Sequence, residues 1–296
     1  MQVFIGLDGG GTACRAQAAL PDGRHTQVFT GGAANVFSDF ATAHQEIKTL
    51  LELALTAAQN LVPDATLAPP RIAVGLAGAS ESGATARLRA ALPYRHVSVH
   101  GDIDISLWGA FGDEDGIVLA VGTGSVLARQ QNGAMHRLGG YGFMLGDEGS
   151  GAWIGREALR RTLHAHDGLG PRTPLVAELW ERFGGVAGLI GFAGRARPAE
   201  YAALAPIVLA HDRASCPVAG AILDQGCAWL QHCLRHLLNR APDMQVAPLG
   251  GLGPVLLERI MAQGGAHLHR VAPKGTALDG ALWKARQGVA KGDQTP

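Results

Sequence analysis

Short apolar runs alternate with amphipathic segments along this chain, and the alternation predicts an α/β fold. From Ile47 to Leu61, apolar residues recur at spacings of three and four, which is typical of a helix with one buried face. Apolar runs that end in glycine, such as Arg71–Leu76, are typical of buried strands. The remaining elements predicted in this half are strands at Val3–Asp8, Cys14–Leu20, Thr26–Thr30 and Val97–His100, and a helix at Ala84–Leu92. The order βββαβαβ favours a lobe with a mixed sheet.

The same order of elements begins again after Gly116. Three strands are predicted first, then a long helix through Ile154 and a mostly helical stretch from 170 to 245. The predicted elements are strands at Ile117–Val121, Val126–Gln130, Ala134–Leu138, Val246–Leu249 and His267–Val271, and helices at Leu175–Phe183, Pro198–His211, Val218–Asn239, Pro254–Ala262 and Leu278–Arg286. We therefore expect an N-terminal lobe over 1–113 and a C-terminal lobe over 114–277, with the helix in 278–296 returning to the first lobe.

Two glycine-rich turns carry the strongest functional signal. Asp8-Gly9-Gly10-Gly11-Thr12 follows the first strand, and Gly122-Thr123-Gly124-Ser125 follows a similar strand later in the chain. Aligning Gly9 with Gly122 gives an offset of 113 residues and places Thr12 on Ser125. Glycine lets backbone N–H groups approach a ligand closely, and successive amides form concavities that bind anions. The repeat therefore predicts two similar lobes that grip the phosphates of one nucleotide in a cleft. Neither turn is a Walker A loop or a dinucleotide-binding fingerprint.

Composition and charge narrow the class of protein. The chain has 296 residues, of which 47% are hydrophobic and 17% charged, as in ordinary globular proteins. Lys plus Arg and Asp plus Glu both number 25, so no net field favours nucleic acid or an anionic membrane. The four cysteines show neither a CxxC pair nor a zinc spacing, and the N-terminus lacks the features of a signal peptide. We expect a cytoplasmic protein with reduced thiols.

A third glycine segment and a longer motif point to a family. Gly250-Gly251-Leu252-Gly253 follows a predicted strand, so three glycine segments stand in the order of the phosphate-1, phosphate-2 and adenosine motifs of the sugar kinase, Hsc70 and actin superfamily. Between the second and third lies 139–151, GGYGFMLGDEGSG, which resembles a segment of N-acetylglucosamine kinases. The chain thus resembles the BadF/BadG/BcrA/BcrD ATPase family, near the glucosamine and N-acetylglucosamine kinases. The resemblance implies two duplicated ribonuclease H-like (actin-like ATPase) lobes with a nucleotide and sugar cleft between them.

The resemblance also implies roles for particular residues. Asp8 is expected to hold Mg²⁺ and Asp102 to act as the catalytic base toward the sugar 6-hydroxyl, with ATP as phosphoryl donor. The expected nucleotide contacts are Gly10, Gly11, Thr12, Thr123, Gly124, Gly251 and Gly253. The expected sugar contacts are Asn35, Asp102, Tyr141, Gly142 and Asp147, with Ser80 as a weaker candidate. Asp104 competes with Asp102, Asp102 itself can cap a helix, and Asp147 is also suited to an N-cap. A homodimer is expected by analogy.

Two departures from the family pattern leave alternatives open. Ala13 stands where many relatives carry Lys or Arg, so one cationic phosphate contact is absent or supplied by Arg15. Tyr141 replaces a Trp of N-acetylglucosamine kinases, which makes free glucosamine as well as N-acetylglucosamine a candidate substrate. The alternatives to a kinase are a family ATPase that activates a partner enzyme and a non-catalytic sugar sensor. The activator needs cysteines for an iron–sulfur cluster, and the spacing of Cys216, Cys227 and Cys233 does not favour one.

Overall fold

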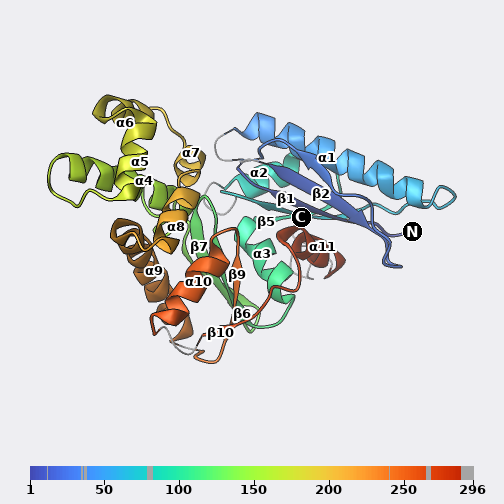
Figure 1. Ribbon diagram of the computed structural model, residues 1–296. Helices are drawn as coiled ribbons and strands as arrows, with labels where there is room; N and C mark the ends of the chain where they lie inside the picture. The colour runs from blue at the N-terminus through green and yellow to red at the C-terminus, as the bar shows by residue number, and fades with distance from the viewer. Residues whose placement is uncertain are drawn as a thin grey trace. The chain divides into compact units, whose positions relative to one another are not determined.

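The chain folds into two compact units, each built on one five-stranded sheet (Figure 1). The computed structural model describes residues 1–11, 13–34, 36, 39–78, 83–239, 241–264 and 268–287. Unit 1 contains Met1–Asp115, Gln130–Met135 and the residues from Ala272 onward, and unit 2 contains Gly116–Arg129 and His136–Val271. Each unit has its own hydrophobic core. The α/β class expected from the sequence is confirmed.

Unit 1 has a mixed sheet in the order β3-β2-β1-β4-β5. Its second strand pairs antiparallel with β1 and β3, whereas β4 and β5 continue parallel to β1. The bounds are β1 Phe4–Gly9, β2 Cys14–Ala19, β3 Phe29–Gly31, β4 Arg71–Leu76 and β5 His96–Gly101, with helices α1 Phe40–Leu61, α2 Ala84–Ala91, α3 Asp102–Phe111 and α11 Ala277–Gln287. Because β1, β4 and β5 are parallel, their carboxyl ends share one edge of the sheet.

The helices of unit 1 cover both faces of this sheet (Figure 1). Asp39 is the N-cap of helix α1, and its side chain accepts a hydrogen bond from the Thr42 N–H. The helix buries Ile47, Leu51 and Ala54 on one face. Helices α3 and α11 cover the other face and cross at two glycines. A Cβ on Gly280 would lie 1.9 Å from the Ile105 carbonyl oxygen, and one on Gly109 would lie 2.0 Å from that of Thr276. This close crossing fixes the start of α3, where Asp102 lies.

Unit 2 repeats the sheet in the order β10-β9-β6-β7-β8 and adds helices. Its strands are β6 Gly116–Val121, β7 Ser125–Gln131, β8 Ala134–Gly139, β9 Gln245–Leu249 and β10 His269–Arg270, and its helices are α4 Gly151–His166, α5 Pro174–Phe183, α6 Val186–Ala193, α7 Pro198–Ala202, α8 Ala205–Arg213, α9 Pro217–Leu238 and α10 Gly253–Ala262. Strand β9 runs parallel to β6, as β4 does to β1. The pattern of strands in the two units is therefore the same.

Several element predictions were wrong in detail. Helices α3 and α6 were not predicted, because the alternation of Asp102–Ile105 and the glycines around Val186 obscure the helical period. The single helix predicted over Pro198–His211 is two helices, α7 and α8. Pro206 lies in the first turn of α8, where its missing N–H is tolerated, and it cannot continue a helix from before.

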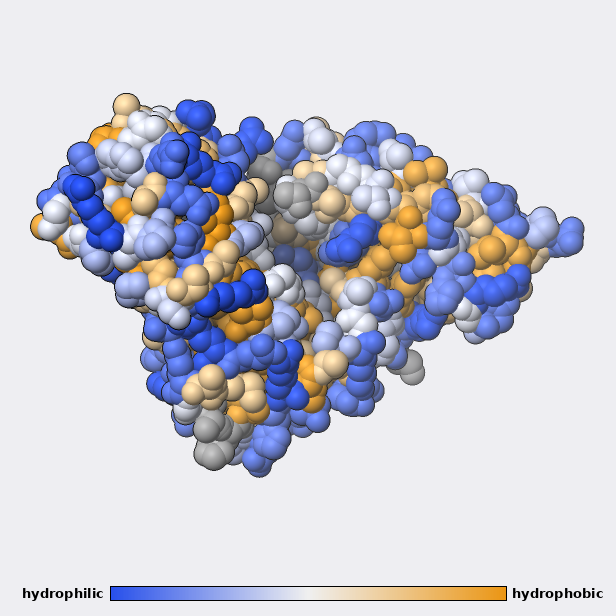
Figure 2. Space-filling model, viewed as in Figure 1, coloured by the Kyte–Doolittle hydropathy of each residue, from blue (hydrophilic) through white to orange (hydrophobic). Residues whose placement is uncertain are grey.

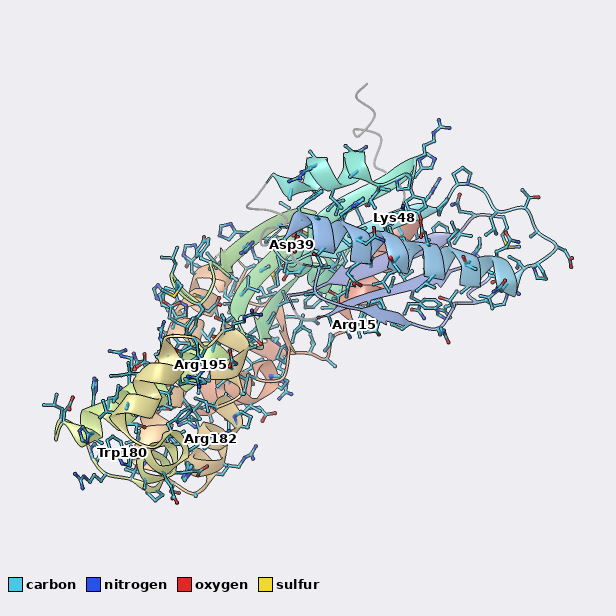
Figure 3. All side chains as sticks on the ribbon, turned by 90° about the horizontal axis from the view of Figure 1, so that it is seen from above. Arg15, Asp39, Lys48, Trp180, Arg182 and Arg195 are labelled. Atoms are coloured by element: carbon cyan, nitrogen blue, oxygen red, sulfur yellow. The ribbon has the colours of Figure 1, made fainter. Side chains whose placement is uncertain are left out.

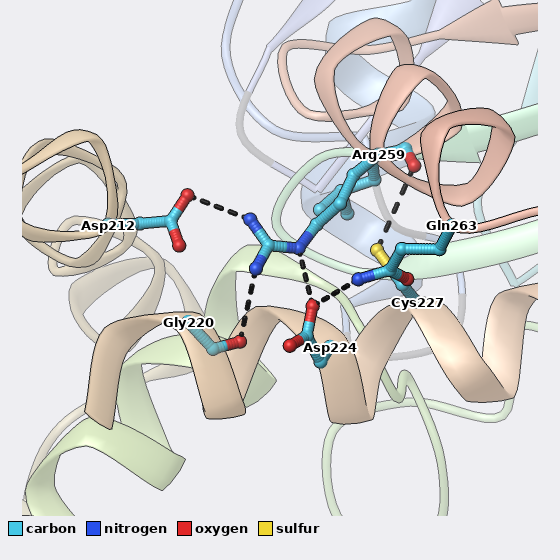
Figure 4. Close-up of polar contacts among 7 residues, drawn as sticks. Asp212, Gly220, Asp224, Cys227, Arg259 and Gln263 are labelled. Atoms are coloured by element: carbon cyan, nitrogen blue, oxygen red, sulfur yellow. Dashed lines mark hydrogen bonds and ion pairs between the residues drawn. The ribbon is translucent and has the colours of Figure 1, made fainter. Parts of the chain in front are cut away.

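An ion-pair network joins three helices of unit 2 (Figure 4). The guanidinium of Arg259 on α10 donates to Asp212 on α8 at 2.8 Å, to Asp224 on α9 at 2.7 Å and to the Gly220 carbonyl at 3.3 Å. Gln263 also donates to Asp224. The network fixes α10, which follows the third glycine segment, against α8 and α9.

The surface is mixed in character. Polar residues cover much of the face shown in Figure 2, with hydrophobic patches between them. Within the described part of the chain, no helix has the length and apolar character needed to cross a membrane. All four cysteines are buried and none forms a disulfide.

Candidate active site

Two carboxylates lie at the shared edge of the unit 1 sheet. Asp8 is the penultimate residue of β1, and Asp102 directly follows β5. Gly9 pairs with Leu76, which pairs with Gly101, so the two strand ends are separated by two strand spacings, roughly 10 Å. The carboxyl ends of parallel strands are where α/β sheets bind ligands. The structure therefore brings both predicted carboxylates to a position suited to chemistry.

The environment of Asp8 is partly buried and charged. Its side chain is 14% exposed and accepts a hydrogen bond at 2.9 Å from the Arg15 guanidinium on β2 (Figure 3 labels Arg15). Burial raises the pKa of Asp8, the Arg15 cation opposes that shift, and the negative charge of Asp102 adds to it. Asp8 and Asp102 are thus close enough to interact electrostatically. Arg15 supplies a cation beside the first turn, where Ala13 leaves none.

Asp102 and Asp104 differ in what their carboxylates do. The Asp104 carboxylate accepts a hydrogen bond at 2.9 Å from the Gly101 N–H, so it stabilises the start of α3. Asp102 accepts one at 2.8 Å from the neighbouring Ile103 N–H. The capping box that closes back on Gly101 is therefore formed by Asp104. Asp102 remains the candidate base.

The first glycine turn is closed by a hydrogen bond from the Gly10 N–H to the Ala13 carbonyl at 2.9 Å. Gly11 is exposed, and a Cβ there would meet nothing within 4 Å. Gly11 therefore offers open backbone to a ligand, whereas the Gly10 N–H is engaged within the turn. Thr12, Asn35 and Ser80 lie outside the described residues.

The second turn in unit 2 is built in the same way but is one residue shorter. The Gly122 N–H donates to the Gly124 carbonyl at 2.9 Å, which matches Gly10 and Ala13 of the first turn. The two hydrogen bonds align Gly10, rather than Gly9, with Gly122. The offset at the turns is therefore one residue smaller than the sequence alignment gave, and Thr12 does not fall on Ser125.

The N-terminus of helix α4 forms hydrogen bonds with this second turn. The N–H groups of Gly151 and Ala152 donate to the carbonyls of Gly122 at 2.8 Å and Thr123 at 3.1 Å. The first N–H groups of α4 are thus used by the turn. Thr123 is exposed, so its side chain and N–H are accessible to a ligand.

Asp147 is directed toward the second turn. A Cβ on Gly124 would lie 2.9 Å from its carboxylate, and the backbone N–H groups of Ser125 and Gly142 donate to it. Burial nevertheless raises the pKa of Asp147, and these hydrogen bonds only partly offset the shift. The N-cap role considered for Asp147 is wrong, because Ser150 caps α4 by accepting from the Trp153 N–H at 3.1 Å.

The glycine-rich segment before Asp147 exposes an aromatic ring. Tyr141 is 68% exposed, and Gly142 has a φ of 86°, which favours glycine. Arg137 fixes the start of the segment by donating to the Gly139 carbonyl at 3.1 Å and the Gly140 carbonyl at 2.6 Å. Tyr141 is therefore accessible for stacking on a ligand.

The third glycine segment lies against the end of β6. The Leu252 N–H donates to the Val121 carbonyl at 3.0 Å, so this segment adjoins the second turn within unit 2. Gly251 is exposed and has open space around it. Gly253 is buried, and a Cβ there would lie 3.0 Å from the Leu119 carbonyl oxygen. Close packing therefore explains why residue 253 is glycine, whereas the backbone of Gly251 is accessible to a ligand.

Two residues that support these segments were not identified from the sequence. Glu46 on α1 accepts a hydrogen bond from the Gly32 N–H at 3.1 Å and so holds the segment that leads to Asn35. Arg137 does the same for the segment that leads to Tyr141. Glu46 contacts backbone 14 residues away in the sequence, and Arg137 contacts the backbone of an irregular segment. Contacts of these two kinds have no local sequence motif.

The donor set fits a hard cation that is held by few protein ligands. Among the described residues, no group of three or more His, Cys, Asp or Glu side chains could enclose a metal ion. One partly buried carboxylate, Asp8, lies beside the phosphate-type turn. Mg²⁺ keeps several waters and is usually bound by one or two carboxylates together with substrate phosphates. The residues present therefore fit Mg²⁺ that arrives with a nucleotide.

The chain belongs to the BadF/BadG/BcrA/BcrD ATPase family, whose model matches residues 5–274. The matched range includes the three glycine segments and both candidate carboxylates, Asp8 and Asp102. The family model therefore spans residues of both units.

Individual relatives are sugar kinases. The chain is 27% identical over 288 residues to the glucosamine kinase of Vibrio cholerae, with 95% of each chain covered. It is 32% identical over 197 residues to the N-acetyl-D-glucosamine kinase of Dictyostelium discoideum, with 61% of this chain and 60% of that protein covered. Among solved structures, a Chromobacterium violaceum protein assigned as an N-acetylglucosamine kinase has a TM-score of 0.83 and 32% identity, covering 96% of this chain and 99% of that one.

The fold extends to more distant kinases. A ROK family glucokinase from Streptomyces griseus has a TM-score of 0.55 at 16% identity, covering 97% of this chain and 99% of that one. At this identity the likeness shows the fold alone. It agrees with the predicted actin-like ATPase architecture.

Proposed function

We propose that this protein is an ATP-dependent amino-sugar kinase that phosphorylates the 6-hydroxyl of glucosamine or N-acetylglucosamine. The observation that carries the proposal is the pair of carboxylates at one sheet edge, Asp8 and Asp102, in a family member whose relatives are amino-sugar kinases.

The proposed chemistry assigns a distinct part to each carboxylate. Asp102 accepts the proton of the sugar hydroxyl as the oxygen–phosphorus bond forms and the bond to the leaving ADP oxygen breaks. Asp8 holds Mg²⁺, which neutralises charge on the transferred phosphoryl group when bound. Arg15 holds the Asp8 carboxylate in place through the ion pair at 2.9 Å.

Unit 2 supplies the accessible backbone for the nucleotide in this proposal. Thr123 and Gly124 are assigned to the phosphates and Gly251 to the adenosine, because two of these three are exposed and all lie at the ends of β6 and β9. Tyr141 and Gly142 are assigned to the sugar. Asp147 has a carboxylate already engaged by two backbone N–H groups, so it contacts sugar with its remaining lone pairs.

The alternative of an activating ATPase fits the cysteines poorly. Cluster ligands must be deprotonated and reachable, yet all four thiols are buried. Burial raises the pKa of Cys14 and of Cys227 to about 12, and it also raises that of Cys233. Burial acts on Cys216 in the same direction, but hydrogen bonds from Thr173 and nearby backbone N–H groups outweigh it and lower the pKa of this one thiol. A non-catalytic sugar sensor does not need two carboxylates at this sheet edge, so the sensor alternative does not explain the Asp8–Asp102 pair.

The test is ADP release by the purified protein with ATP and Mg²⁺ in the presence of single sugars. The sugars are glucosamine, N-acetylglucosamine, N-acetylmannosamine and glucose, with a control that lacks sugar. Strong stimulation by glucosamine or N-acetylglucosamine is expected, followed by detection of the 6-phosphate by NMR. Turnover independent of sugar would favour the activating ATPase, and no turnover with any sugar would favour the sensor.

A further inference from the structure

A second pocket lies in unit 1 at the end of α3 opposite Asp102. Its volume is about 480 Å³, within the range of small-molecule sites. Helix α3 has 10 residues, so the pocket lies roughly 15 Å from the sheet edge that carries Asp102. The side chains that decide its chemistry are Trp108, Asp113, Lys274, Asp279, Trp283 and Arg286. None of them has a part in the proposed phosphoryl transfer.

Two indole rings give the pocket an aromatic wall. The ring centroids of Trp108 and Trp283 are 6.0 Å apart, with an angle of 32° between the planes. The Lys284 ammonium stands 4.9 Å from the centroid of the Trp108 ring. Indole faces attract cations, and they also pack against the C–H face of a pyranose. The wall therefore suits a ligand that combines a sugar ring with an ammonium group.

Two of the four charged groups are already engaged by the fold. Lys274 forms an ion pair with Glu114 at 2.5 Å, and the Asp279 carboxylate accepts a hydrogen bond from the Thr276 N–H at 2.7 Å. Asp113 and Arg286 are exposed, and neither has an ion pair within the described part of the chain. These two groups are available to a ligand.

The balance of charge selects the class of ligand. Around the pocket and its aromatic wall, the cations Lys274, Lys284 and Arg286 are balanced by the carboxylates Asp113, Glu114 and Asp279, so there is no excess of positive charge for a phosphate. The C-terminus of α3, at Phe111, directs the negative end of its helix dipole here, which disfavours anions and favours cations. Nucleotides and sugar phosphates are thus poorly matched, and a cationic polyol is well matched.

We propose that this pocket is a second binding site for an amino pyranose, separate from the catalytic edge. The ammonium group lies at Asp113, a pair of hydroxyls lies at Arg286, and the apolar face of the ring packs on Trp283. The ligand class comes from the pocket itself, and only the identification of this ligand with the enzyme's own substrate rests on the proposed function.

The test counts binding sites by isothermal titration calorimetry with glucosamine in the absence of nucleotide. The wild-type protein is expected to show two sites. Asp113→Asn is expected to weaken one site about tenfold or more, the range for a hydrogen bond to a charged group. Trp283→Leu is expected to weaken the same site about tenfold through loss of the aromatic packing surface. Glucose and N-acetylglucosamine, which lack the ammonium, are expected to bind this site about tenfold more weakly than glucosamine. Asp64→Asn and Trp229→Leu, exposed residues outside the pocket, are matched controls that keep both sites.

The outcomes separate this inference from the proposed function. Binding that neither pocket variant weakens, whether one site or two are counted, overturns this site even if the kinase is active. Two sites, one of them lost in both variants, support it even if no sugar is phosphorylated. Melting temperatures of the variants within about 2 °C of the wild type exclude misfolding as the cause of any loss.

Discussion

The two units have sheets with the same strand order but different side chains at the sheet edge. In each, three strands are followed by two strands parallel to the first, and a tight turn of glycines joins the first two strands. In unit 1 the sheet edge carries Asp8 and Asp102. In unit 2 the position matching Asp8 is Ala120, and β10 is followed by Val271. The repeated sheet therefore supplies accessible backbone in both units, while acidic residues at the ends of the parallel strands themselves occur in unit 1 only. The carboxylate beside the turn of unit 2, Asp147, comes from the segment before α4.

The second difference is how each unit is held together. Unit 1 brackets its sheet with α1 on one face and the close pair α3 and α11 on the other. Unit 2 adds helices between β8 and β9, and Arg259 on α10, after β9, joins two of them, α8 and α9. Unit 2 also has close glycine contacts, since a Cβ on Gly155 would lie 2.0 Å from the Tyr201 carbonyl oxygen, so its ion-pair network is an addition to such packing. Four substitutions test this comparison.

Asp102→Asn is expected to have the largest effect. Loss of the general base should lower kcat about a thousandfold, with sugar binding largely retained, because the amide keeps the shape but cannot accept the proton. The measurement is kcat and KM by coupled ADP assay, together with sugar affinity by calorimetry. The control is Asp104→Asn, whose carboxylate caps α3: it should lose about 1 kcal/mol of stability and keep most of its activity. Full activity in Asp102→Asn would remove the base assignment.

Gly280→Ala tests the backbone contact in unit 1. Its Cβ would lie 1.9 Å from the Ile105 carbonyl oxygen, so α11 must move away from α3, at a cost of about 3 kcal/mol. The free energy of unfolding by urea measures it. Gly191→Ala on α6 is the matched control, since its Cβ meets only the end of Arg195 at 3.7 Å, and it should gain about 0.5 kcal/mol from helix propensity. Equal effects of the two would show that the crossing is not a tight contact.

Arg259→Ala tests the network in unit 2. Removing the guanidinium leaves Asp212 and the Gly220 carbonyl without their donor, and we expect a loss of about 2 kcal/mol, between the values for exposed and buried pairs. Arg182→Ala, on the exposed surface of α5 (Figure 3), should change stability by less than about 0.5 kcal/mol. Thermal unfolding of both variants decides whether the network matters more than a surface arginine does.

Asp8→Asn should have the smallest effect on stability, and with the opposite sign. Burial raises the pKa of Asp8, so this group favours folding fully below its ordinary pKa, and the contribution is lost as the pH rises through the raised value. A neutral amide should therefore raise the melting temperature at pH 7 by about 2 °C, a gain that shrinks as the pH falls. Phosphoryl transfer should be lost at the same time.

Asp22→Asn is the control for that prediction. Asp22 is also paired with an arginine, Arg24, but is exposed, and that hydrogen bond lowers the pKa of Asp22. Its substitution should give no gain in melting temperature at any pH. A gain equal to that of Asp8→Asn would mean that burial of Asp8 is not the cause.

The sheets and the two glycine turns could be predicted from sequence because their signals are local. Apolar runs that end in glycine identify β1, β4, β6 and β9, and the repeat of the turn relates the two units. Helix α3 was missed because Asp-Ile-Asp-Ile alternates as a strand does. The register of the repeat was displaced by one because the extra residue of the first turn is seen only in its hydrogen bond from Gly10 to Ala13.

The candidate site was predictable as a set of residues but not as a set of contacts. Asp8 and Asp102 follow strand signals, so their place at a sheet edge could be anticipated. That Asp104, not Asp102, caps the Gly101 N–H, and that Asp147 is directed toward Gly124, depends on side-chain geometry that spacing does not encode. Glu46 and Arg137 form hydrogen bonds to the backbone of irregular segments, and no sequence motif predicts such contacts.

The return of the last helix to unit 1 has a consequence for how the protein is made. Residues up to Asp115 leave the ribosome first, but α11, which covers Gly6 and packs on α3, is translated only after about 160 further residues, about ten seconds or more later. Most of unit 2 is continuous in sequence and can fold in the interval. Unit 1, which holds both carboxylates, must wait with one face of its sheet covered by α3 alone. A nascent chain that stops before Ala277 would therefore carry both Asp8 and Asp102 yet lack a finished unit to hold them.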